Sequence, residues 1–204
     1  MITVKNISFN YEKTIIFNNF THIFAENSKT VVIGESGRGK TTLLNLLLGF
    51  EVPDKGEIFF DNVLLNQETI GSIRQKIAWL PQNFNVPFDS VGELFNSIFE
   101  LKINRKKKIS AIEIQDIFSE LGIETELLNK KIGEISGGQK QRVILAALVL
   151  SDKKHIFLDE PSSALDEIST NKIIELLWKN KNSTVIIVSH DKLFAEKADF
   201  VLNL

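Results

Sequence analysis

The chain has 204 residues, of which 43% are hydrophobic and 25% charged, and its formal net charge is -2. These values are ordinary for a globular domain with a substantial core, and they give no sign of the basic surface that nucleic-acid binding requires. The sequence contains no cysteine, which excludes disulfide bonds, thiol chemistry and cysteine-ligated metal sites.

The first third of the chain predicts mainly strands, because apolar and polar residues alternate or short β-branched runs end at glycine or proline. A turn is expected at Asn10–Lys13, and a helix from Lys40 to Leu48 that ends at Gly49. The predicted strands are residues 2–9, 15–24, 29–34, 56–65 (as a hairpin) and 76–82.

The middle of the chain predicts helices. Ser90 with Glu93, and Ser110 with Glu113, match the capping box that begins a helix. Ser136 can cap a third helix, which carries the longest apolar run, Val143–Leu150. That run is far too short to cross a bilayer, so we expect no direct insertion into the membrane. The basic stretch 104–108 is expected to be a solvated loop.

The last third predicts alternating strands and helices: a strand at 155–160, a helix at 168–180, a strand at 184–190, then a short helix and strand. Such alternation at both ends of the chain favours a parallel α/β core. The helical middle is then an insertion. We expect a core lobe of about residues 1–82 and 151–204, and a helical lobe of about residues 83–150.

The segment Gly34-x-x-x-x-Gly39-Lys40-Thr41 has the spacing of a phosphate-binding loop and lies between a predicted strand and a predicted helix. Glycines let backbone N–H groups converge on anionic oxygens, and the helix N-terminus adds its positive dipole end. Lys40 would neutralise phosphate charge, and the Thr41 hydroxyl could bind Mg²⁺. The alternative is a glycine-rich turn without a ligand.

A second motif lies at residues 156–161, where an apolar strand ends in the acidic residues Asp159 and Glu160. Asp159 at the strand tip can hold Mg²⁺, usually through water, and Glu160 can orient or deprotonate an attacking water. An acidic helix cap would be the structural alternative.

The segment "ISGGQKQR" (135–142) lies between these two motifs. A phosphate loop, then Ser-Gly-Gly-Gln, then Leu-Asp-Glu-Pro is an order that resembles the ATP-binding cassette (ABC) family over essentially the whole chain. The resemblance implies one nucleotide-binding domain at 1–204, with ATP and Mg²⁺ as cofactors. The implied fold is α/β: a P-loop NTPase (RecA-like) core with an antiparallel β subdomain and an inserted α-helical subdomain.

The resemblance also implies roles for individual residues. Gln82 and His190 would be switch residues at the γ-phosphate, acting with Lys40 and Glu160 in catalysis, and Mg²⁺ would be held by Thr41, Gln82 and Asp159. Arg38 stands where a small residue is common, so its side chain is expected to point to solvent. The implied ATP-binding residues are Tyr11, Gly34, Glu35, Ser36, Gly37, Arg38, Gly39, Lys40, Thr41, Thr42, Ser136, Gly137, Gly138, Gln139 and Asp166.

Several of these residues also have structural alternatives. Tyr11 could be a half-buried turn residue, Gln82 a polar residue after Pro81, and the loop that carries Asp166 a simple helix cap. His22 and His155 match no motif and are expected to be structural.

The implied assembly is a head-to-tail homodimer that closes over two ATP molecules and drives a separate transmembrane permease, which would dock near Gln82–Phe95. This places the chain in the cytoplasm, peripheral at the cytoplasmic face of the plasma membrane. One alternative is a soluble ABC ATPase that acts on ribosomes, an assembly scaffold or cell division. Another is a module that uses ATP only as a clamp, against which Glu160 argues.

Overall fold

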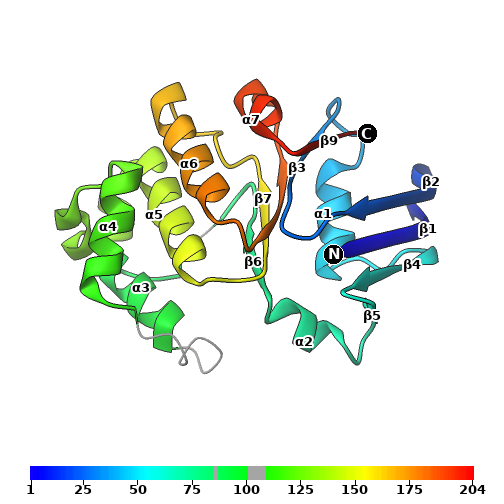
Figure 1. Cartoon of the computed structure of the whole chain (residues 1–204), viewed down its shortest axis with the longest axis horizontal. Coiled ribbons are helices and arrows are strands. Elements are labelled where there is room, and N and C mark those ends of the chain that lie inside the picture. The colour runs from blue at the N-terminus through cyan, green and yellow to red at the C-terminus, as the bar shows by residue number, and fades with distance from the viewer. Residues whose placement is uncertain (85–86, 101–108) are drawn as a thin grey trace.

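The computed structural model describes residues 1–84, 87–100 and 109–204, and Figure 1 shows the whole chain. The basic stretch 104–108 lies outside the described residues, as do positions 85 and 86 of the expected permease-docking stretch.

An antiparallel sheet forms one side of the molecule. Its strand order is β2-β1-β4-β5, with β1 (Ile2–Tyr11), β2 (Thr14–Phe24), β4 (Lys55–Phe60) and β5 (Val63–Leu64). The predicted turn at Asn10–Lys13 is too long, because Asn10 and Tyr11 pair with Ile15 and Thr14. The hairpin turns instead at two residues, and Glu12 takes the positive φ of 54° that such a tight turn needs.

A parallel sheet forms the centre of the molecule, in the order β6-β7-β8-β3-β9. Its strands are β3 (Lys29–Ile33), β6 (Ile77–Leu80), β7 (His155–Asp159), β8 (Thr184–Val188) and β9 (Phe200–Asn203). Every residue of β7 and β8 is buried, as expected for parallel strands covered on both faces. The predicted α/β class is therefore confirmed.

Helices cover both faces of this sheet. They are α1 (Lys40–Leu48), α2 (Ile70–Arg74), α3 (Val91–Glu100), α4 (Ala111–Leu121), α5 (Gly137–Leu150), α6 (Glu167–Lys179) and α7 (Lys192–Lys197). Two short 3-10 helices, η1 (Thr125–Asn129) and η2 (Ile132–Glu134), precede α5. Helix α1 ends at Gly49 as predicted, with a φ of 65° that suits glycine.

The capping predictions for α4 and α5 are confirmed, since both helices begin with complete capping boxes at Ser110 and Ser136. At α3 the motif is displaced by one residue. The Ser90 hydroxyl accepts from the Glu93 N–H, but the Glu93 carboxylate accepts from the N–H of Asp89.

The two faces of the parallel sheet pack against different partners. Alternate residues such as Val32, Phe157 and Ile186 face α1, which lies between the two sheets (Figure 1), and share a hydrophobic cluster with the antiparallel sheet. Their neighbours Val31, Leu158 and Ile187 belong to a second cluster on the opposite face. Because successive side chains of a strand point to opposite faces, the parallel sheet packs on one face against α1 and on the other against the second cluster.

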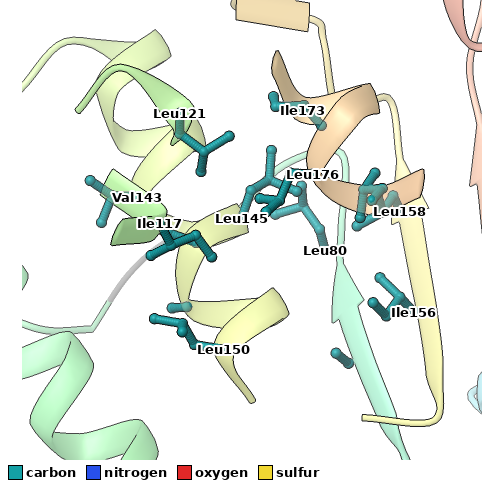
Figure 2. Packing of buried hydrophobic residues seen from close by; sticks show 14 of the residues in the cluster. Leu80, Ile117, Leu121, Val143, Leu145, Leu150, Ile156, Leu158, Ile173 and Leu176 are labelled. Carbon is teal, nitrogen blue, oxygen red and sulfur yellow. The ribbon is translucent and has the colours of Figure 1, made fainter. Parts of the chain in front are cut away.

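The second cluster joins the helical segment to the core. Figure 2 shows Leu80 of β6, Leu145 of α5 and Leu176 of α6 converging in it, and α4 contributes Ile117 and Leu121. Each fully buried leucine of this kind contributes about 1.5–3 kcal/mol to folding. The proposed boundary between a core lobe and a helical lobe therefore crosses continuous apolar packing, and the two-lobe division stays a prediction.

Among the described residues, no helix is both long enough and apolar enough to span a membrane.

His155 begins β7 and is fully buried. Its ring lies edge-on to Phe60, with centroids 5.4 Å apart, and neither ring nitrogen has a hydrogen-bond partner within the described part of the chain. Burial lowers the pKa of this imidazole to about 4. His22, by contrast, is half-buried between Phe20 and Phe24 on β2, and burial lowers its pKa too.

The pKa of His155 predicts a pH dependence of stability. Between pH 6.5 and about 4 the unfolded chain binds a proton at this residue and the folded chain does not, so the free energy of unfolding should fall as pH falls. Each pH unit is worth at most about 1.4 kcal/mol. Denaturant titrations across this range should show a flatter profile for His155→Leu than for the wild type. Identical slopes would contradict the assignment.

Candidate functional site

The phosphate-loop residues form the connection between β3 and α1. Gly34 and Gly39 have φ values of 151° and 89°, and neither has room for a side chain. A Cβ at Gly34 would lie 2.6 Å from the Leu204 carbonyl oxygen, and one at Gly39 would collide with the Ile16 side chain. Glycine is therefore required at both positions by backbone conformation and by close approach.

Lys40 folds back across this loop. Its ammonium group donates to the carbonyl oxygens of Gly34 and Glu35, both at 2.9 Å, and the residue is only 7% exposed. The Arg38 side chain points to solvent, as expected, and its 3.4 Å ion pair with Glu35 is exposed. An exposed pair of this kind contributes little to stability. The loop is thus held mainly by the buried lysine.

Thr41 and Asp159 meet although they come from different elements. The Thr41 hydroxyl at the start of α1 donates to one Asp159 carboxylate oxygen at 2.9 Å, at the end of β7. The other carboxylate oxygen is buried and has no hydrogen-bond partner among the residues that the structure describes. Burial raises the pKa of Asp159, and the hydrogen bond from Thr41 counteracts this. A free buried oxygen beside a hydroxyl is a donor set that fits a hard cation such as Mg²⁺.

Glu160 lies next to Asp159 in a strained backbone conformation, with a φ of 49°. Its N–H donates to the Val188 carbonyl at 2.8 Å. Its carboxylate is contacted by the Ser189 hydroxyl at 3.5 Å, the His190 N–H at 3.4 Å and the His190 Nε2 at 3.5 Å. These are long contacts, so the carboxylate is oriented but weakly held.

These side chains surround one cavity of about 210 Å³. Its lining brings together predicted residues from four segments of the chain: the phosphate loop with α1, the end of β7 with Glu160, His190 in the loop after β8, and Gln82 after β6. The lining residues are Ser36, Gly37, Gly39, Lys40, Thr41, Thr42, Gln82, Asp159, Glu160, Val188 and His190.

Tyr11 is at the end of β1 and is 60% exposed, with its ring 6.5 Å from that of Phe9. It does not line the cavity, and neither do Gly34, Glu35 and Arg38. The half-buried alternative for Tyr11 is wrong, because the side chain faces mainly solvent.

The second group of predicted residues lies elsewhere in the same chain. Ser136 and Gln139 exchange hydrogen bonds at the N-terminus of α5, where Ser136 and Gly137 are exposed. Asp166 caps α6 by accepting from the Ser169 N–H at 2.7 Å, and this bond lowers the pKa of Asp166. None of these residues lines the cavity around Lys40. The structure therefore places this second group outside the cavity around Lys40, although Gly137 lines an open cavity of about 480 Å³ together with Gln82.

Two residues close to the site escaped prediction. Ser189 is fully buried and contacts the Glu160 carboxylate. Gln141, also buried, bonds to the backbone of Glu160 and of Ala164. The only sequence signal for them is proximity, since Ser189 precedes His190 and Gln141 follows the Ser-Gly-Gly-Gln segment.

The chain is similar in sequence to ATP-binding proteins of transporters. The sequence profile of the ABC transporter family matches residues 17–163. The ergothioneine transport ATP-binding protein of Helicobacter pylori is 33% identical, over 97% of this chain and 93% of its own length. An energy-coupling factor transporter ATP-binding protein of Mycoplasmopsis pulmonis is 33% identical, over 99% of this chain and 78% of its own.

Solved structures agree with these relatives. The ATP-binding cassette MJ0796, in a dimeric post-hydrolysis state bound to ADP and Pi, superposes with a TM-score of 0.86. It is 27% identical, and the alignment covers 100% of this chain and 94% of that one. On the strength of the profile match, the relatives and the shared fold, the chain belongs to the ABC transporter family.

Proposed function

We propose that this chain is the ATP-binding and ATP-hydrolysing subunit of an ABC transporter, and that it energises a separate transmembrane permease. The observation that carries this function is the cavity in which the phosphate loop, Asp159, Glu160, Gln82 and His190 meet. ATP binding and hydrolysis also follow from family membership.

In the proposed complex, ATP occupies this cavity with its phosphates on the loop 34–39 and on the N-terminus of α1. The Lys40 ammonium exchanges its two carbonyl partners for phosphate oxygens. Tyr11 offers an exposed ring face on which the base can stack. Thr41, Asp159 and Gln82 hold Mg²⁺, which neutralises charge on the phosphates when bound.

Hydrolysis is assigned to Glu160 and His190. The Glu160 carboxylate is placed at the cavity wall, where it can orient a water and accept its proton. The exposed His190 imidazole can donate to the γ-phosphate in place of its long contact with Glu160. Gln82 lines the same cavity, and it also lines a second cavity with Gly137, Lys140 and Gln141 of the helical segment.

The position of the second group outside the cavity around Lys40 supports a composite site in a head-to-tail homodimer. Ser136, Gly137, Gly138 and Gln139 form a helix N-terminus of the kind that binds anions, yet they lie outside their own chain's cavity. A second copy can bring this turn, and Asp166 near it, to the γ-phosphate. The dimeric state of the similar cassette MJ0796 supports this arrangement.

Docking to a permease is proposed for the surface around Gln82–Phe95. An open cavity of about 480 Å³ lies beside Gln82, Asn83 and Phe84. Next to this stretch, Trp79 on β6 is partly buried, with its ring 5.0 Å from that of the exposed Phe50, which also stacks under Arg74. The exposed Phe50 ring suits contact with a helix of another protein.

The relatives favour transport over a non-transport ABC role, because they are named as transporter ATP-binding proteins. Their named cargoes differ, from ergothioneine to zinc, so the proposal assigns no cargo to this chain. With a membrane-embedded partner, the chain would be peripheral at the cytoplasmic face of the plasma membrane.

Lys40→Ala should weaken ATP binding by about tenfold or more, because it removes a buried charge-assisted partner of the phosphates. Equilibrium titration with a fluorescent ATP analogue measures the change. Lys55→Ala, at an exposed position of β4, is the control and should bind normally. Equal affinities for the two variants would contradict the role of Lys40.

Glu160→Gln should lower the rate of ATP hydrolysis by about 100-fold or more, the usual effect of losing a general base. It should also accumulate an ATP-dependent dimer, measured by light scattering on a sizing column with Mg-ATP. Glu175→Gln, an exposed change on α6, should remain active and show no trapped dimer. A monomeric Glu160→Gln at saturating Mg-ATP would count against the composite site.

Tagged Glu160→Gln, loaded with ATP, should recover a multi-span membrane protein from detergent-solubilised membranes of the source cells. Mass spectrometry identifies the partner, and the same experiment on cytosol is the comparison. Recovery of only soluble partners from both fractions would favour the non-transport ABC ATPase instead.

A further inference from the structure

Gln141 connects two segments that the proposed function assigns to different ATP sites. It lies on α5, and only 3% of it is exposed. Its side-chain Nε2 donates to the Glu160 carbonyl oxygen at 3.3 Å, and its Oε1 accepts from the Ala164 N–H at 3.2 Å. A single amide thus bonds to both ends of the segment 160–164.

The backbone of Glu160 decides where its carboxylate points. The N–H of Glu160 is anchored on Val188 at 2.8 Å, and the carbonyl is anchored on Gln141. The carboxylate itself has only the long contacts to Ser189 and His190. Because a φ of 49° is costly for glutamate, this conformation persists only while its neighbours impose it. Gln141 is one of those neighbours.

The other end of this connection is the exposed turn of Ser136. Ser136 caps α5 and Gln141 lies near the same end of this helix, so a displacement of the α5 N-terminus shifts both. Gly138 packs directly on the same loop, since a Cβ there would lie 2.8 Å from the Ala164 carbonyl oxygen. The α5 N-terminus and the segment 160–164 are therefore in contact through both backbone and side chain.

We propose that Gln141 is a positioning residue that transmits contact between the Ser136 turn and the partner's γ-phosphate to Glu160 of its own chain. The inference rests on the proposed composite dimer. ATP at one site then orders the Glu160 carboxylate that hydrolyses ATP at the other site. Neither site therefore hydrolyses ATP until both are closed. Gln141 itself touches no substrate.

Gln141→Met tests this role, because methionine is unbranched and similar in size but makes neither hydrogen bond. We expect kcat for ATP to fall about tenfold, as for a buried hydrogen bond lost in the active state. ATP affinity and ATP-dependent dimerisation should change less than about threefold by the same reasoning, because the phosphate contacts remain. Gln115→Met, the same change at an exposed position of α4, is the matched control and should behave as the wild type.

A second variant guards against simple misfolding. Gln141→Leu also makes neither hydrogen bond and brings no charge into this buried position, so kcat should fall here too. Wild-type kcat in both variants would overturn the proposal. So would loss of dimerisation together with kcat, because that indicates a purely structural role. If Glu160→Gln fails to dimerise, the composite dimer itself is contradicted, and transmission across it falls as well.

Discussion

The site depends on one constraint: four parallel strands end at the same edge of one sheet. The pairing of β6 with β7, β7 with β8, and β8 with β3 fixes their register through backbone hydrogen bonds. Gln82 and His190 follow β6 and β8, Asp159 is the last residue of β7, and the phosphate loop follows β3. Because parallel strands point the same way, residues proposed for the site that are far apart in the sequence meet at one edge, and Thr41 and Asp159 can form their hydrogen bond there.

Two ionisable groups are buried at this edge of the sheet. Lys40 and Asp159 are both nearly inaccessible; the lysine donates to two carbonyl oxygens, whereas the aspartate accepts from one hydroxyl and keeps its other oxygen without a partner among the described residues. A buried charge with incomplete partners is costly, so such groups favour ligands of opposite charge. The same double-sided apolar packing that stabilises the sheet therefore buries the two groups to which we assign phosphate and Mg²⁺.

Features set by neighbouring residues could be predicted from the sequence. The stop of α1 at Gly49 and the capping box at Ser110 need only a few adjacent side chains. The loop around Lys40 and the acidic pair at residues 159–160 were likewise found from spacing, and the structure brings them together.

Features that need distant partners could not be predicted. The five residues of α2 are too few for a helical period, and Arg74 bonds back to the end of α1. The strand order of the parallel sheet arises from packing between segments far apart in the chain. Gln141 and Ser189 stand out only because the fold brings them to Glu160, where Gln141 bonds to the backbone and Ser189 contacts the carboxylate. Their residue types alone carry no signal.

The aromatic group at Trp79 gives the molecule an optical reporter. The chain has only two tryptophans, and the partly buried Trp178 on α6 packs against Phe194 and donates from its Nε1 to the Lys197 carbonyl oxygen. Trp79 lies instead beside the exposed Phe50 and the cationic Arg74. With Trp178 replaced by phenylalanine, the emission wavelength of the remaining indole would follow the hydration of this one surface. Assembly with a partner could then be timed in a stopped-flow instrument without attaching any dye.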